Sequence, residues 1–249
     1  MAQDNPARRL HSLLTNAFEI EDQFQDKQNL SSRTVWAQVF KTKDADTEVL
    51  EYLEELHFLI KHTREAIKGL PGVRHELYLK PIEFFSLRIS QKGLIGDKWG
   101  NQGRHLRQQH MLDLLEATAD AIDNDNYLIE LTQEQLNGLL SDAKSMLEEV
   151  LNSDLDNDIK MFLVIRLEEI CSAIQHYAVS GSAGLRKVVE ANIGSTLLKS
   201  FGVKTEETNQ LRKFVGLMVK IGSWIGILAD TESFLLPKVS EIFRQLPPG

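Results

Sequence analysis

The sequence is poor in residues that interrupt helices or cross-link chains. It has one cysteine, Cys171, so no internal disulfide can form, and such a chain suits a reducing compartment. Six prolines are spread over 249 residues, and runs of alternating apolar and polar residues, which would predict strands, are missing. Helical periodicity is present along nearly the whole chain. We therefore expect an all-α multi-helix bundle of about 8–10 helices without a significant sheet.

Sequence motifs of the common enzyme classes are also missing. The chain has no P-loop, no Gly-x-Ser-x-Gly and no His-Glu-x-x-His. Glu54 and His57 have the spacing of half a di-iron site, but the second Glu-x-x-His that a bundle site needs is not there. We expect no bound metal and no cofactor. The sequence leaves open whether the protein is an enzyme, but it favours a non-enzymatic role.

Charge is spread unevenly along the chain. The net charge of −8 argues against bulk affinity for nucleic acid. The segment from Arg74 to His110 contains seven Lys or Arg residues and only three acids. The segment from Asp123 to Asp158 contains ten acids and a single basic residue, Lys144. Such segments either pair with each other or present two different faces to partners.

The acidic turn after Ile122 divides the predicted organisation into two helical regions. We expect residues 1–122 to form an N-terminal helical region and residues 127–249 a C-terminal one packed against it, or both to form one continuous domain. Two apolar stripes with helical spacing stand out, at 50–70 and 163–177. The first comprises Leu50, Leu53, Leu56, Ile60, Ile67 and Leu70; the second comprises Leu163, Leu167, Ile170, Ile174 and Tyr177.

Further helices are predicted between and after these stripes. Phe84, Phe85 and Leu87 are core candidates of a helix that follows the first stripe. Thr132 and Gln135 match a capping box at the start of another helix. A last helix is predicted beyond residue 231, near the end of the chain.

A glycine-rich segment at 92–103 is the best candidate for an anion site. It has four glycines in twelve residues and is followed by a predicted helix from Arg104 to about Ile122. A helix start exposes unpaired N–H groups and a positive dipole end, which favour an anion. We expect cationic side chains to add charge and an exposed tryptophan to offer a stacking surface for anion or RNA binding. The residues are Lys98, Trp99, Arg104, His105 and Arg107.

The same helix carries an arginine and a histidine six positions apart, Arg104 and His110, with His105 beside the arginine. This spacing resembles the Arg-x(4–6)-His motif of HEPN ribonucleases, which are all-helical proteins of bacterial toxin and defence systems. The resemblance covers seven residues. It implies that two copies meet across a dimer to cleave RNA without metal. Arg104 would hold the phosphate, and His110 would act as acid or base.

The most apolar segment runs from residue 214 to 229, with Lys220 as its only charge. A helix that is apolar on every side must be hidden in a core, a partner or a bilayer. At 16 residues it is shorter than the usual membrane span of about 20. All three locations stay open for 211–229, and the residues that would form an interface or enter a membrane are Phe214, Leu217, Ile221, Trp224 and Ile225.

These observations favour a non-enzymatic helical component of protein–protein interaction or assembly, of the kind found among bacterial accessory or defence proteins. It would assemble through the two stripes or through 211–229. The alternatives are a ribonuclease or RNA-binding toxin that uses Arg104 and His110, and a membrane-active effector that uses 211–229. We expect a protein partner or a homo-oligomer, with RNA or a membrane as less favoured partners, and a cytoplasmic location because the N-terminal residues lack the apolar core of a signal peptide.

Overall fold

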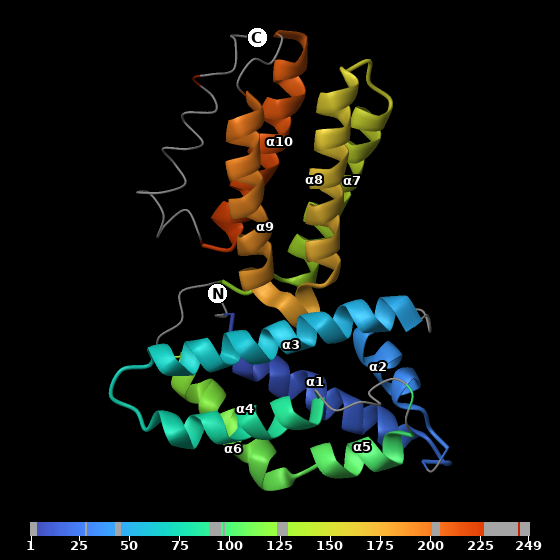
Figure 1. The fold of residues 1–249 in the computed structure, drawn as a ribbon, viewed down its shortest axis with the longest axis vertical. Helices are drawn as coiled ribbons and strands as arrows, with labels where there is room; N and C mark the ends of the chain where they lie inside the picture. The colour runs from blue at the N-terminus through green and yellow to red at the C-terminus, as the bar shows by residue number, and fades with distance from the viewer. Residues whose placement is uncertain are drawn as a thin grey trace. The chain divides into compact units, whose positions relative to one another are not determined.

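The computed structural model describes residues 4–27, 29–42, 46–89, 96, 98–123, 129–200, 205–226 and 244. Within these ranges the chain forms ten α-helices and no strand, so the predicted all-α fold is confirmed (Figure 1). Contacts divide the chain into two compact units. Unit 1 comprises Met1–Asp4, Tyr127–Tyr177 and Gly181–Gly249, and unit 2 comprises Asn5–Asn126 and Ala178–Ser180.

Unit 2 is built around its first helix, α1, which contacts α2, α3 and α6. Asn5 begins α1: its side-chain oxygen accepts from the N–H groups of Ala7 (3.0 Å) and Arg8 (3.1 Å), and its amide donates to the carbonyl of Ala119 (2.7 Å). One residue thus caps α1 and ties it to α6. The helices of unit 2 are α1 (Pro6–Gln23), α2 (Ser32–Phe40), α3 (Asp46–Gly69), α4 (His75–Ile89), α5 (Trp99–Leu106) and α6 (Gln109–Asp123).

A row of aromatic rings joins three of these helices in the core of unit 2. Trp99 of α5 meets Trp36 of α2 edge to face, with ring centroids 5.7 Å apart. Trp36 stacks on Phe40 at 5.5 Å, and Phe40 stacks on Tyr52 of α3 at 4.9 Å. Such pairs contribute about 0.5–1.5 kcal/mol each beyond the area they bury. The row therefore fixes how α5 and α2 pack.

Unit 1 contains α7 (Gln133–Leu151), α8 (Asn157–Gln175), α9 (Tyr177–Ser200) and α10 (Thr205–Trp224). The predicted capping box is confirmed: Thr132 and Gln135 bond reciprocally at the start of α7. α7 and α8 lie side by side as a hairpin. Two ion pairs tie α10 to α7: Lys213 with Glu149 (2.6 Å) and Lys220 with Asp142 (2.7 Å).

A kink divides α9 near its start. Gly181 has φ +62°, a conformation that side chains other than glycine rarely adopt. The hydroxyl of Tyr177 accepts from the N–H of Leu131 (2.7 Å) and bonds the hydroxyl of Ser182 (2.8 Å). The N–H of Ser182 in turn donates to Asp4 (3.0 Å). This buried network holds the second part of α9 in place within unit 1.

Two predicted core residues are instead exposed. Leu50 is 53% exposed, because it lies about 100° around α3 from the buried side chains of Leu56, Ile60 and Ile67. Leu87 is 62% exposed, because it follows the buried Phe85 by two residues and therefore lies about 200° around α4 from it. The rest of the first stripe is buried, as the sequence predicts.

We expect Gly103→Ala to destabilise unit 2 by about 1–3 kcal/mol, because a Cβ there would lie 2.5 Å from Nε1 of Trp99, whose ring is fully buried and cannot move away. Gly100→Ala in the same helix is the control, since its Cβ would meet only the carbonyl oxygen of Lys27 at an ordinary 3.5 Å. Urea unfolding, followed by the fluorescence of Trp36 and Trp99 in a Trp224→Phe background, measures both. Equal effects of the two substitutions would contradict this packing.

The free energy of unfolding of unit 2 is expected to decrease when the pH is lowered below about 6.5, which is the ordinary pKa of histidine. Burial lowers the pKa of His62, and the charge of Arg9 lowers it further. The folded state therefore resists protonation: its stability is complete above the unfolded pKa and declines as the pH falls below it. In the same unfolding assay, His62→Gln should flatten this decline; a variant whose stability declines as steeply as that of the wild type would show that His62 is not the cause.

Candidate interaction surface

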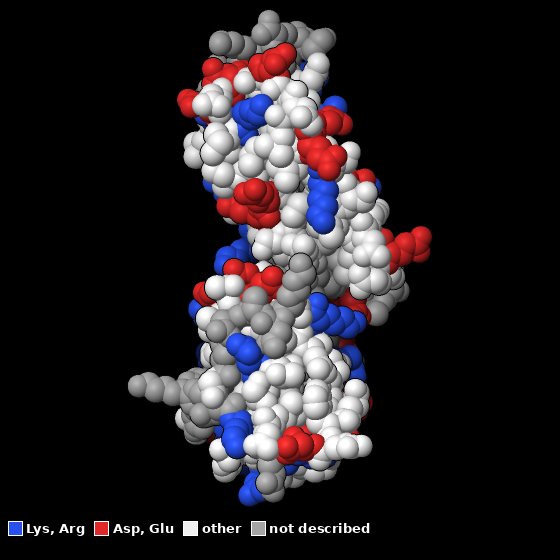
Figure 2. All heavy atoms as spheres, turned by 90° about the vertical axis from the view of Figure 1, so that its right-hand side faces the viewer, with Lys and Arg blue, Asp and Glu red and all other residues white. Residues whose placement is uncertain are grey.

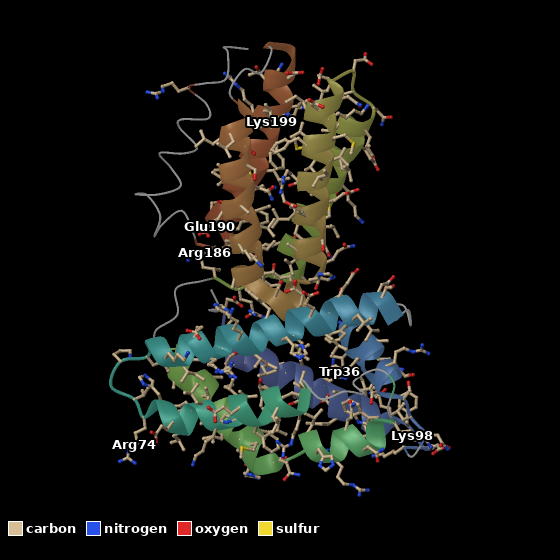
Figure 3. All side chains as sticks on the ribbon, in the orientation of Figure 1. Trp36, Arg74, Lys98, Arg186, Glu190 and Lys199 are labelled. Carbon is tan, nitrogen blue, oxygen red and sulfur yellow. The ribbon has the colours of Figure 1, made fainter. Side chains whose placement is uncertain are left out.

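The predicted anion site is not an open helix start with a stacking ring. Trp99 is fully buried, and its backbone N–H donates to the carbonyl of Leu30 (2.7 Å). Trp99 is the first residue of α5, so the helix begins five residues before the predicted start at Arg104. Lys98 donates to the side chain of Asn29 (2.9 Å). Figure 3 shows Lys98 at the edge of unit 2 and Trp36 inside it. The sequence prediction of an exposed tryptophan is wrong because the ring is needed for the aromatic core.

Arg107 is also occupied. Its guanidinium donates to Oδ1 of Asp22 (3.0 Å) and forms an ion pair with Glu21 (3.4 Å). It also lies over the ring of Phe18, 5.3 Å from its centroid. Hydrogen bonds from Arg107 and Lys27 hold the pKa of Asp22 well below its ordinary value. The guanidinium therefore links the α5–α6 junction to the end of α1.

The predicted single helix from Arg104 to Ile122 is two helices in the structure. Arg107 has a non-helical ψ of 68°, and the N–H of Gln108 bonds the carbonyl of Leu106 (2.8 Å). Arg104 thus lies in the last turn of α5 and His110 in the first turn of α6; both, and His105, are exposed. The break follows from the long-range pairing of Arg107, which local spacing does not reveal. A catalytic role for Arg104 and His110 stays a prediction.

The apolar C-terminal run lies in the core of unit 1 as far as the structure describes it. Phe214, Ile221 and Ile225 are fully buried, Leu217 is 8% exposed, and Trp224 packs against this core. Of the three locations that the sequence leaves open for 211–229, the structure has the core, so these five side chains pack within unit 1. α10 ends at Trp224 rather than 229, where Gly226 follows with φ +83°. Residues 227–229 and the helix predicted beyond 231 lie outside the described residues, apart from Arg244.

The two apolar stripes are likewise internal. All five residues of the stripe at 163–177 are buried in unit 1, and the stripe at 50–70, apart from Leu50, is buried in unit 2. Neither seam is free to bind a partner, which overturns the predicted routes of assembly. Each seam holds its own unit together.

A different apolar surface lies on the outward side of α8. Met161 is 54% and Ile165 44% exposed, on consecutive turns, and Phe162 and Val164 beside them are half-buried. Only Leu163, the middle residue of this five-residue run, is fully buried. We call the four side chains of Met161, Phe162, Val164 and Ile165 the α8 patch. Adjoining apolar side chains that a helix leaves at the protein surface are a candidate binding surface.

Acidic groups lie at both ends of the α8 patch. Asp158 precedes Met161 by three residues and Glu168 follows Ile165 by three, so all four lie on one stripe of α8. In the described part of the chain neither Asp158 nor Glu168 forms an ion pair, and both are exposed. Figure 2 shows the side of unit 1 that includes α7 and α8, on which acidic side chains are exposed together with basic and neutral ones.

The basic side chains near the α8 patch already have partners. Lys160 donates to the carbonyl of Ser153 (3.0 Å), and Arg166 forms an ion pair with Glu169 (2.8 Å) while lying over the ring of Phe162. Lys160 keeps its positive charge, because a carbonyl is not a charged partner, but the carboxylates of Asp158 and Glu168, unpaired in the described part of the chain, outnumber it next to the patch. The sequence analysis does not predict this surface, because the stripe that it predicts on the same helix is the buried one. The five consecutive apolar residues from Met161 to Ile165 are the pattern that indicates an apolar surface on the other side.

Three surface hollows lie elsewhere in the described chain. One of about 600 Å³ lies in unit 2, and two of about 280 and 580 Å³ lie in unit 1. The first is mostly apolar with one carboxylate, and that group, on Asp120, is already paired with Arg8 (2.9 Å). The 280 Å³ hollow lies beside the ion pairs that join α7 to α10. The third lies at the acidic turn before α8.

Groups suited to chemistry are sparse in the described residues. There, no three or more His, Cys, Asp or Glu side chains are placed to hold a metal ion. Cys171 is buried, and burial raises the pKa of its thiol, which disfavours the reactive thiolate. None of the described helices is long and apolar enough to span a bilayer.

Comparison with protein-family models, with curated proteins and with solved structures gave no match. The function must therefore be argued from the surfaces of the chain itself, of which the α8 patch is the strongest candidate.

The two sides of α8 should respond differently to truncation. Ile165→Ala is expected to cost unit 1 about 1 kcal/mol or less, because nearly half of the residue is in water and its removal leaves no closed cavity. Leu163→Ala should cost about 2–5 kcal/mol, since it leaves a cavity in the core. Urea unfolding followed by helical circular dichroism measures both. A large loss from Ile165→Ala would mean that the chain itself covers the patch.

Proposed function

We propose that this protein is a non-enzymatic interaction component whose protein partner binds the α8 patch. The observation that carries the proposal is the exposure of Met161 and Ile165 on consecutive turns of one helix. Isolated exposed leucines, such as Leu50 and Leu87, are ordinary on protein surfaces. Large apolar side chains that adjoin one another are a more specific sign of a binding surface.

The residue types of the α8 patch also suit recognition. Methionine is flexible and polarisable and fits irregular partner surfaces, and phenylalanine is enriched in the cores of interfaces. The patch lies on a regular helix whose opposite side is anchored by Leu163 and Leu167 in the core. A rigid support lowers the entropy that binding would otherwise lose.

The proposal is tested by native mass spectrometry of the protein purified from its own host. The wild type is expected in a complex heavier than the 28.3 kDa chain. The double variant Met161→Ser/Ile165→Ser should appear mainly as the free chain, with the bound fraction reduced about tenfold, because truncated hot spots cost at least about 1.4 kcal/mol in total.

Leu50→Ser/Leu87→Ser is the matched control, since it removes exposed apolar side chains from unit 2 and should leave the complex intact. A wild-type chain found only as a free monomer would contradict the proposal. A complex that persists in the Met161→Ser/Ile165→Ser variant would contradict it equally.

A further inference from the structure

We infer that the partner at the α8 patch presents an amphipathic helix with basic residues on both sides of its apolar positions. This inference rests on the proposed function and names the chemistry of the partner. Its basis is the order of side chains along one stripe of α8: the acid Asp158, the apolar Met161 and Ile165, and the acid Glu168. From Asp158 to Glu168 the stripe rises by ten residue steps, which is about 15 Å of helix.

The partner helix would make two kinds of contact with this stripe, apolar contacts and ion pairs. Its apolar side chains would cover Met161 and Ile165, which are the most exposed members of the patch. Lysine or arginine one turn beyond on each side would then reach Asp158 and Glu168, which lack ion-pair partners in the described part of the chain. The matching sequence is basic, two residues, apolar, three residues, apolar, two residues, basic.

A second copy of this chain is a poor occupant of the same surface. In an antiparallel pair of α8 helices centred on Leu163, Asp158 of each copy would lie opposite Glu168 of the other. In a parallel pair each acid would lie opposite the same residue of the other copy. Both symmetric arrangements bring like charges together, and such juxtapositions are unfavourable. Basic side chains of a different protein relieve the same charges.

The residues around the α8 patch also carry more negative than positive charge. Asp154, in the turn before α8, is exposed and likewise has no ion pair among the described residues. Arg166 is neutralised by its ion pair with Glu169, and the positive charge of Lys160, which donates to the carbonyl of Ser153, is outnumbered by the carboxylates of Asp154, Asp158 and Glu168. An anionic membrane would meet the same unpaired carboxylates, so a basic peptide fits the surface better than a lipid headgroup does.

The test uses the full chain and three designed helical peptides of about 18 residues that share one apolar face of leucine. Their polar faces carry lysine, glutamate or glutamine. Binding is measured by fluorescence anisotropy at about 50 and 500 mM NaCl. The lysine peptide should bind at least about tenfold more tightly than the glutamate peptide, and high salt should weaken it about tenfold.

Variants of the full chain identify the surface. Asp158→Asn/Glu168→Gln should weaken the lysine peptide about five- to tenfold, and Met161→Ser/Ile165→Ser at least as much. Glu51→Gln/Glu54→Gln, which removes two exposed acids of α3, is the control for the same charge change and should have little effect. Circular dichroism of each variant confirms that the helices are retained.

Two outcomes would overturn the inference and leave the proposed function standing. The glutamate or glutamine peptide could bind as tightly as the lysine peptide while still depending on Met161 and Ile165. The chain could form a dimer that the Met161→Ser/Ile165→Ser variant abolishes. Binding of anionic lipid vesicles through the same two residues, without any peptide or second copy, would overturn both the inference and the proposed protein partner. If no peptide, copy or vesicle binds in a way that depends on Met161 and Ile165, and native mass spectrometry shows only free chain, both the inference and the proposed function fail.

Discussion

The helix α8 is apolar around more of its circumference than the core of unit 1 can cover. Leu163 and Leu167 take the inward positions, and each helix of a bundle has only one such side. Met161, Phe162 and Ile165 are therefore left at or near the surface, although they belong to the same apolar run. Burial of these side chains would be favourable at about 25 cal/mol per Å². Within the described protein nothing covers them fully, and that imbalance is what the functional argument depends on.

The remaining apolar surfaces have internal uses that explain why they are not candidates. Trp99 completes the aromatic row of unit 2, and the run after Phe214 fills unit 1. Lys220, the one charge in that run, leaves the core to pair with Asp142 and to lie over the ring of Trp224. The most apolar segment of the sequence is thus a structural element. Apolarity along the sequence is a poor guide to a binding surface unless burial is known.

Local signals in the sequence predicted local structure well. The capping box of Thr132 and Gln135 and the inward stripe of α8 depend on neighbouring residues, and the structure has both. The split between α5 and α6 depends on Arg107 reaching Asp22, 85 residues away. The burial of Trp99 depends on Trp36. Long-range contacts of this kind leave no periodic trace, so the sequence does not predict the burial of Trp99 or the pairing of Arg107.

Oxidation of methionines by dilute hydrogen peroxide, read by peptide mass spectrometry, tests the central claim most directly, because the rate follows solvent exposure. In the isolated, folded chain, Met161 should be oxidised at least about tenfold faster than the buried Met218 and Met146. If Met161 is instead as slow as Met218 in a monomeric sample, the chain covers its own α8 patch and the account of a free recognition surface is wrong.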